Sequence, residues 1–211
     1  MKRLLVYCEG PTEESFVRTV LAPYFLGMNA FAVPIGASGV SKYSIIKKEL
    51  KRICKDDHTA TITTMLDYYG LPSDTPGVSA TSGTIYNKVE YIETTVEADL
   101  GELKNLIFNL SLHEYEGLLF SHISAFEGIA DNKQLAALKS IIENFETPEH
   151  INNSYDTAPS RRIEKIIPDY SKVNDGIKVA QRIGIDVFSA KCKHFERWIA
   201  KLTTWAKDGA R

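Results

Sequence analysis

The chain has 211 residues, of which 44% are hydrophobic and 25% charged, and its formal net charge is −2 at pH 7. This composition excludes a disordered chain, and the near-neutral charge excludes a uniformly basic nucleic-acid sleeve and a highly acidic mimic. A chain of this length buries enough surface to fold as one domain, or one domain with an appendage, without disulfides or metal.

The first half of the chain predicts strands that alternate with helices. Apolar or β-branched runs predict strands over residues 3–8, 30–35, 59–66 and 103–112, and amphipathic segments predict helices after Thr12 and over residues 41–55 and 86–100. Thr12 is expected to cap the first of these helices. This alternation predicts an α/β fold with a mainly parallel sheet flanked by helices.

From residue 113 onward the sequence predicts mainly helix, and we expect a mostly helical C-terminal extension. The expected domains are an α/β core over residues 1–120 and a helical subdomain over residues 121–211 that packs on the core. No stretch approaches the roughly 18 uninterrupted apolar residues of a membrane helix. The short apolar run at the start ends at Glu9, before signal-peptide length. We therefore expect a cytoplasmic protein with no membrane contact.

Acidic residues follow three of the predicted strands. Glu9 follows the first strand, Asp67 the third, and Glu114 and Glu116 the fourth. Ligands of open α/β sheets gather at the carboxyl ends of the strands, and carboxylates are the ligands that Mg²⁺ and Mn²⁺ prefer. Such an ion can activate water and stabilise the leaving oxygen in phosphodiester cleavage. The four acids are therefore predicted as catalytic and metal-binding residues.

Each acid also has a simpler interpretation. Taken alone, a Glu before Gly-Pro or an Asp after a strand is typical of a turn or cap. The coincidence of three strand ends is what favours the metal site. His113, beside the last pair of acids, fits a base, a ligand or a hydrogen-bonded structural histidine.

Seven short motifs together resemble the domain-of-unknown-function 4276 (DUF4276) family, and the resemblance covers essentially the whole chain. They are EGPTE at 9–13, DYYGLP at 67–72, HEYEGLLF at 113–120, PEHIN at 148–152, APSRR at 158–162, PDYSK at 168–172 and CKHFERW at 192–198. The resemblance implies a variant of the TOPRIM fold, the metal-binding α/β domain of topoisomerases, primases and overcoming-lysogeny-defect nucleases. It also implies an ABC-like or AAA-type ATPase as partner in prokaryotic defence.

By this resemblance Glu9 matches the first-motif glutamate of TOPRIM domains, a metal ligand or general acid/base, and Asp67 matches the first acid of their Asp-x-Asp motif. The second acid of that motif is replaced by Tyr69. Three consequences are open: Glu114 or Glu116 supplies the missing ligand, metal binding is weak, or catalysis is lost.

The near-zero charge is a cancellation. Residues 160–211 contain 12 Lys+Arg and 6 Asp+Glu, a net +6, and the first 159 residues carry a net −8. Arg161, Arg162 and Lys172 lie in the basic part, and guanidinium groups match phosphate geometry. We predict that these three residues bind phosphate, with a solvated helical face as the alternative.

Together with the resemblance, the sequence predicts a Mg²⁺- or Mn²⁺-dependent nuclease subunit that cuts DNA or RNA, and the resemblance implies that it acts with an ATPase. The alternative is a non-catalytic TOPRIM-like regulatory or scaffold partner of an ATPase, motivated by Tyr69. A small phosphotransferase or phosphatase that uses the same acids is a third class, since phosphate-ester chemistry shares the same metal requirements.

Overall fold

A computed structural model describes residues 1–112, 114–151 and 157–208. The chain forms two compact units, the first comprising Met1–Leu112 with Ala206–Arg211 and the second comprising His113–Trp205. The domain boundary predicted above lies at residue 120. His113 and Asn152, which the motifs include, lie outside the described residues. No helix in the described parts of the chain has the length and hydropathy needed to span a bilayer.

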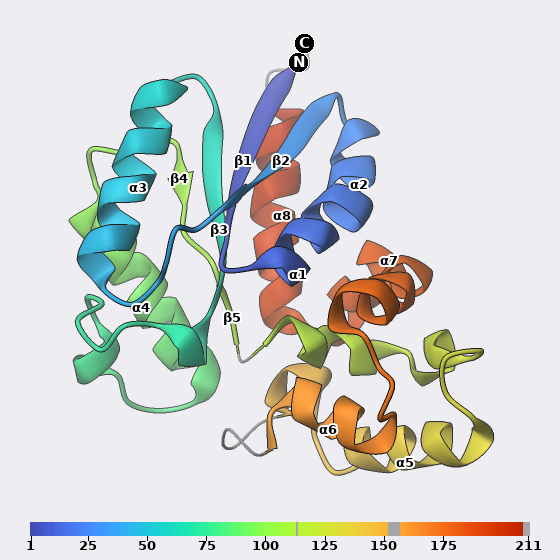
Figure 1. Cartoon of the computed structure of the whole chain (residues 1–211). Coiled ribbons are helices and arrows are strands. Elements are labelled where there is room, and N and C mark those ends of the chain that lie inside the picture. The colour runs from blue at the N-terminus through green and yellow to red at the C-terminus, as the bar shows by residue number, and fades with distance from the viewer. Residues whose placement is uncertain (113, 152–156, 209–211) are drawn as a thin grey trace. The chain divides into compact units, whose positions relative to one another are not determined.

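The first unit is built on a parallel sheet (Figure 1). Its strands pair in the order β2-β1-β3-β4, and β5 also pairs with β3. All of these pairs are parallel, which confirms the predicted sheet. The strands are β1 (Lys2–Cys8), β2 (Ala30–Gly36), β3 (Thr61–Asp67), β4 (Leu106–Ile107) and β5 (Leu110–Ser111).

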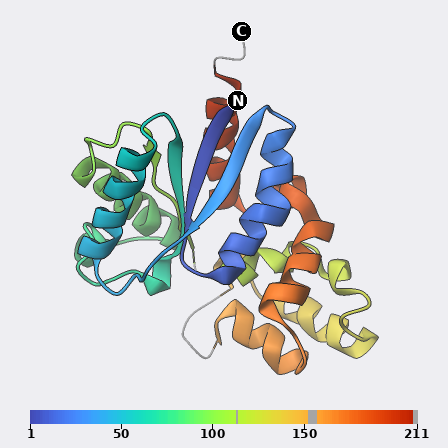
Figure 2. The same cartoon turned by 45° about the horizontal axis from the view of Figure 1, so that its top comes forward.

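Helices flank both faces of this sheet (Figures 1 and 2). On one face, α1 (Pro11–Phe16) continues through a π-helical turn, Val17–Leu21, into α2 (Ala22–Leu26) and contacts β2. On the other face, α3 (Tyr43–Asp56) and α4 (Ile85–Asp99) bury their apolar sides with strand residues in one core cluster. The predicted α/β arrangement is therefore confirmed.

Two local predictions are wrong. Gly10, not Thr12, is the N-cap of α1, because Pro11 takes the first helical position and Glu13 Oε2 accepts the Gly10 N–H at 3.0 Å. The fourth strand, expected over residues 103–112, is two short strands, β4 and β5. Between them, the backbone N–H of Asn109 donates to Thr64 Oγ1 at 2.8 Å, so a side chain replaces the strand ladder.

The second unit is helical, as predicted for the C-terminal stretch. Its helices are α5 (Asn132–Ile142), α6 (Pro159–Ile166), α7 (Ile177–Lys191) and α8 (Lys193–Lys207), the last two residues of α8 being assigned to the first unit. The 3₁₀ turns Tyr115–Ser121 and Ile123–Phe126 precede α5, and a π-helical turn, Lys172–Gly176, precedes α7. A buried carboxylate caps α8, since Glu149 accepts the backbone N–H groups of His194 at 3.0 Å and Phe195 at 2.9 Å. Trp198 of this helix is buried.

Candidate functional site

Glu9 and Asp67 meet at the carboxyl ends of two neighbouring parallel strands. Cys8 of β1 lies beside Met65 of β3 in the sheet register, and the Glu9 backbone N–H continues the pairing by donating to Met65 O at 3.1 Å. The Asp67 backbone N–H then donates to Glu9 Oε2 at 3.0 Å. The parallel topology therefore places the Glu9 carboxylate against the backbone of Asp67.

A glycine lets the next turn close over the Glu9 carboxylate. Asp67 is followed by a single 3₁₀ turn, Tyr68–Gly70. A Cβ on Gly70 would lie 2.8 Å from Glu9 Oε1, which is closer than van der Waals contact permits. Tyr69, at the position of the missing acid, is 55% exposed, and its ring contacts that of Tyr68 with 5.3 Å between centroids.

One further carboxylate, that of Glu49, contacts β1 near this edge of the sheet. Glu49 of α3 accepts hydrogen bonds from the Tyr7 hydroxyl and from Ser38 N, and these bonds outweigh the effect of burial and lower the pKa of Glu49. Burial, helped by Glu49 and Glu9, raises the pKa of Tyr7. The Lys-rich sequence of α3 conceals Glu49, whose only signal is that it interrupts a run of basic residues.

The donor chemistry of Glu9 and Asp67 fits a hard divalent cation. Mg²⁺ is commonly held by one or two carboxylates, with water and substrate phosphate completing its shell. Among the described residues, no group of three or more His, Cys, Asp or Glu side chains is arranged to hold a metal. Glu9 and Asp67 therefore stay predicted metal ligands.

The second unit holds the other two predicted acids, and both have protein partners. Glu114 Oε2 accepts the backbone N–H of Ser160, at the start of α6, at 3.1 Å. Glu116 is only 4% exposed, and its Oε1 lies 4.0 Å from Lys172 Nζ. Burial raises the pKa of Glu116 to about 7, against the opposing charge of Lys172.

Two further residues, which the sequence analysis did not single out, interact with Glu116: Glu164 and Tyr170. Glu164 Oε1 lies 3.8 Å from Lys172 Nζ and contributes to the raised pKa of Glu116. The Tyr170 hydroxyl is buried without a hydrogen-bond partner among the described residues. Burial, with a smaller contribution from Glu116, raises the pKa of Tyr170. Tyr170 lies in the PDYSK motif, which is the one signal that could have marked it.

The three predicted phosphate-binding residues differ in how they are held. Arg161 is half exposed and pairs with Glu164 at 3.1 Å, and Lys172 is shared between Glu116 and Glu164. Arg162 donates to the backbone carbonyl of Thr157 at 2.7 Å and stacks over Phe145 with 5.4 Å to the ring centroid. Arg161 is thus the most exposed of the three cations, Lys172 and Arg162 are partly buried, and Arg162 also supports its own unit.

The structure therefore brings the predicted site residues together as two sets, each within one unit. Glu9 and Asp67 form one set, in the first unit. Glu114, Glu116 and Lys172 form the other, in the second unit, with Arg161 linked through Glu164.

Comparisons with known proteins bear on the family. A comparison with curated proteins finds no match. A comparison with solved structures aligns 95% of this chain with 97% of the C-terminal region of the OLD protein of Xanthomonas campestris pv. campestris, at 12% sequence identity and a TM-score of 0.35. The model of the family described as Domain of unknown function (DUF4276) matches residues 8–203. This match confirms the resemblance seen in the motifs, and the chain belongs to the DUF4276 family.

Proposed function

We propose that the protein is a divalent-metal-dependent nuclease subunit that cleaves phosphodiester bonds of DNA or RNA. The observation that carries the proposal is the contact of Asp67 with the Glu9 carboxylate at the ends of β3 and β1. Acids at this edge of a parallel sheet occupy the usual ligand-binding position of such folds.

Glu9 and Asp67 would hold Mg²⁺ or Mn²⁺. The bound ion would supply Lewis-acid stabilisation of charge on phosphate oxygens and a lower pKa for a bound water. The Asp67 N–H fixes the orientation of the Glu9 carboxylate, and Gly70 leaves the space that this carboxylate occupies. Glu114 and Glu116 remain predicted ligands. The pKa of Glu116, about 7, also suits a group that exchanges a proton at neutral pH.

Arg161, Arg162 and Lys172 would steady substrate phosphates, Arg161 being the most exposed of the three. We further propose, on the family resemblance, that the subunit acts in the cytoplasm with an ABC- or AAA-type ATPase in prokaryotic defence.

A second candidate function is a non-catalytic scaffold for that ATPase. The observation that favours it is Tyr69, an exposed aromatic residue at the position where the resemblance implies an acid.

Metal titration combined with cleavage tests the proposal. Binding of Mn²⁺ is measured by calorimetry, and cleavage of duplex DNA, single-stranded DNA and RNA is measured with and without the ATPase. The variants are Glu9→Gln and Asp67→Asn, with Glu90→Gln, an exposed acid of α4, as matched control. Gln at position 9 keeps an acceptor for the Asp67 N–H, so the fold is preserved.

We expect both site variants to lower Mn²⁺ affinity at least about tenfold and to abolish cleavage, since each removes a carboxylate ligand. The control should match wild type. Wild-type cleavage by Glu9→Gln would refute the site. Absence of Mn²⁺ binding and of cleavage, with the ATPase still bound, would favour the scaffold.

A further inference from the structure

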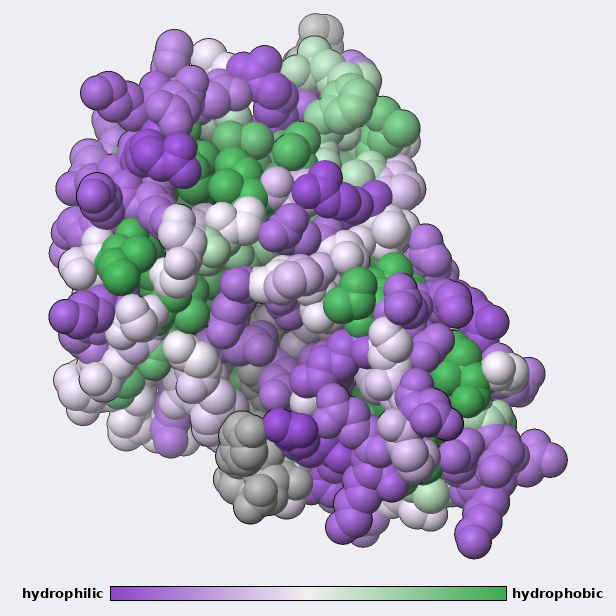
Figure 3. Space-filling model, viewed as in Figure 1, coloured by the Kyte–Doolittle hydropathy of each residue, from purple (hydrophilic) through white to green (hydrophobic). Residues whose placement is uncertain are grey.

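The edge strand β2 exposes apolar side chains on one face of the sheet. Along β2, the buried residues Ala30, Ala32 and Pro34 alternate with Phe31, which is 48% exposed, and Val33, which is 40% exposed. Parallel sheets are normally covered on both faces. Figure 3 shows the exposed area as a green patch over β1 and β2, beside the hydrophilic surface of α3. This end of the sheet therefore lacks part of its covering layer.

The exposed face of β2 is the face on which α3 packs. Ile35, two residues after Val33, packs against the core cluster to which α3 contributes. The Tyr7 hydroxyl of β1 donates to Glu49 of α3, which ties the helix to the same face. An open pocket of about 500 Å³ lies on the surface of α3 and is lined by Ser44, Ile45, Lys48, Glu49 and Arg52, of which Glu49 contacts Tyr7 of the sheet. We call Phe31, Val33 and these five residues the β2–α3 surface.

The helical wall of the β2–α3 surface carries positive charge. Lys48, Arg52 and Lys55 are spaced four and three residues apart, so they share one side of α3, and all three are exposed. Lys48 and Lys55 form no hydrogen bond or ion pair with any described residue. The lysines Lys47 and Lys51 instead pair with Asp99 and Glu102.

The carboxylate of Glu49, which is part of the β2–α3 surface, already has hydrogen-bond partners. Glu49 accepts from Tyr7 and Ser38, and Arg52 forms an exposed pair with Asp56 at 3.2 Å. An acidic group of a partner could therefore pair with Lys48 directly. At Arg52 it would replace Asp56 as the ion-pair partner.

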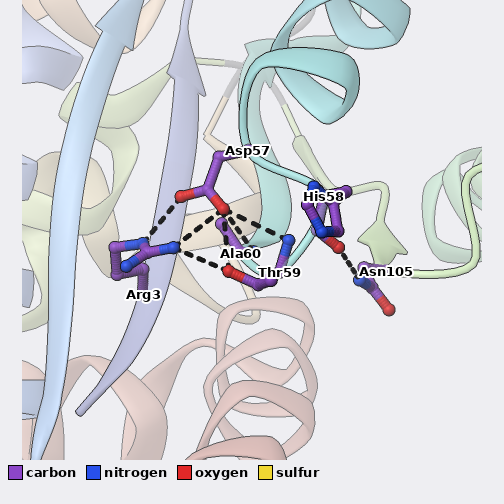
Figure 4. Close-up of polar contacts among 6 residues, drawn as sticks. All are labelled: Arg3, Asp57, His58, Thr59, Ala60 and Asn105. Atoms are coloured by element: carbon purple, nitrogen blue, oxygen red, sulfur yellow. Dashed lines mark hydrogen bonds and ion pairs between the residues drawn. The ribbon is translucent and has the colours of Figure 1, made fainter.

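Two neighbouring features restrict what can bind. Pro34 removes a backbone donor from the edge strand, which disfavours the addition of another strand. Arg3, paired with Phe31 in the sheet register, is held by Asp57 at 2.6 and 2.9 Å and by Thr59 at 2.6 Å (Figure 4).

A nucleic-acid backbone would match Lys48 but would leave Val33 in water. A helix with an apolar face and acidic flanks satisfies both the apolar strand and the basic wall.

We propose that the β2–α3 surface binds an acidic amphipathic helix of a partner protein. The helix would bury Phe31 and Val33 beneath its apolar face and place carboxylates against Lys48 and Arg52. This interaction requires no metal and no cleavage, so it goes beyond the proposed function and stands or falls separately from it.

The test uses the full chain and fluorescence anisotropy with synthetic helical peptides. The first peptide, of about 18 residues, carries leucines at helical spacing and glutamates on both flanks, and the second replaces the glutamates by lysines. The protein variants are Phe31→Ser with Val33→Ser, and Lys48→Glu with Arg52→Glu. The matched controls are Tyr91→Ser, at a residue 47% exposed on α4, and Lys133→Glu on α5. Circular dichroism checks that each variant is folded, which we expect because the substituted positions are exposed.

We expect the acidic peptide to bind wild type and both controls with saturation. The double serine variant should weaken binding at least about tenfold, through loss of apolar burial. The double glutamate variant should weaken it at least about fivefold, and it should bind the lysine peptide better than wild type does.

Several results would overturn the proposal. They are no saturable binding of the acidic peptide to wild type, equal binding by the serine variant, and no exchange of peptide preference in the glutamate variant. Displacement of the acidic peptide by a single-stranded oligonucleotide would identify a nucleic-acid surface instead. A concentration-dependent dimer in sedimentation, lost in the serine variant, would identify a second copy of this chain as the occupant. Loss of cleavage with unchanged peptide binding would concern the metal site alone.

Discussion

Glu9 accepts a hydrogen bond from the backbone N–H of Asp67, so a side chain of one strand end serves as acceptor for the backbone of the next. The carboxylate that we propose as a metal ligand therefore also supports the sheet. Stability and metal binding at this position are separable, because an amide can replace the carboxylate as hydrogen-bond acceptor but not as a strong ligand for a hard cation.

Glu9→Ala is expected to lower the free energy of unfolding by about 1–3 kcal/mol, because it leaves the partly buried N–H of Asp67 without its acceptor. Glu9→Gln keeps an oxygen in place and should cost less than about 1 kcal/mol. Urea unfolding followed by circular dichroism, with EDTA present, measures both. Equal stability of the two variants would contradict the acceptor role.

Gly70→Ala should displace the Glu9 carboxylate. The added Cβ would lie 2.8 Å from Glu9 Oε1, so we expect weaker Mn²⁺ binding than in wild type. Gly27→Ala is the control, since its Cβ meets the nearest atom at an ordinary 3.4 Å. Calorimetric titration of the two variants measures the effect, and identical Mn²⁺ affinities would count against the close approach.

Glu116 makes stability depend on pH. Its pKa is raised from 4.5 to about 7 by burial, so between these values the folded chain binds more protons than the unfolded chain. The contribution of Glu116 to the free energy of unfolding is therefore highest below about pH 4.5 and falls as the pH rises to about 7. Glu116→Gln should match wild type near pH 4.5 and exceed it by roughly 1–3 kcal/mol at pH 8. Urea titrations in EDTA test this expectation, which a pH-independent difference would refute.

Substitution of Arg161 should weaken nucleic-acid binding, whereas substitution of Arg162 should lower stability. Arg161→Ala removes an exposed pair of small energetic value, so stability should change by less than about 0.5 kcal/mol. Binding of a single-stranded oligonucleotide should weaken, with the slope of log affinity against log salt reduced by about 0.7–1.

Arg162→Ala should instead cost about 1–2 kcal/mol of stability, through the bonds to Thr157 and Phe145. Anisotropy at several salt concentrations and thermal unfolding distinguish the two variants. A salt slope unchanged by Arg161→Ala would contradict its phosphate contact.

Glu149 is expected to be a structural residue. Glu149→Ala leaves two buried N–H groups at the start of α8 without their acceptor and should lower the free energy of unfolding by about 2–4 kcal/mol. The stability of Glu149→Gln should lie between that of wild type and that of Glu149→Ala. Glu146→Ala, at an exposed neighbour, serves as control. Thermal unfolding of the three variants measures this, and equal melting temperatures for Glu146→Ala and Glu149→Ala would refute the cap.

The strands of the sheet were largely predictable because their signals are local. The apolar runs that form β1, β2 and β3 end at Gly, Pro or acidic residues, and their alternation with amphipathic helices identified the parallel topology. The fourth strand was not predictable in detail. The backbone N–H groups of Phe108, Asn109 and Leu110 bond to side chains of Glu97, Thr64 and Glu93, which are remote in sequence.

The same distinction applies to the candidate site, where some contacts could be predicted from the sequence and others could not. Contact between Glu9 and Asp67 follows from two strand ends in a parallel sheet, so the sequence could predict it. The contacts of Glu49 with Tyr7 and of Glu164 with Lys172 depend on how helices pack, and no spacing in the sequence indicates them. The roles of Glu114, Glu116 and Lys172 toward metal and phosphate stay predictions.

The chain leaves the first unit after Leu112 and returns to it at Ala206, where Asp208 O accepts a hydrogen bond from the Lys2 side chain. This order has a consequence for synthesis on the ribosome. At about 5–20 residues per second, translation of the second unit separates the β-sheet from its closing segment by roughly 5–20 seconds. The second unit is therefore translated before the first can be completed.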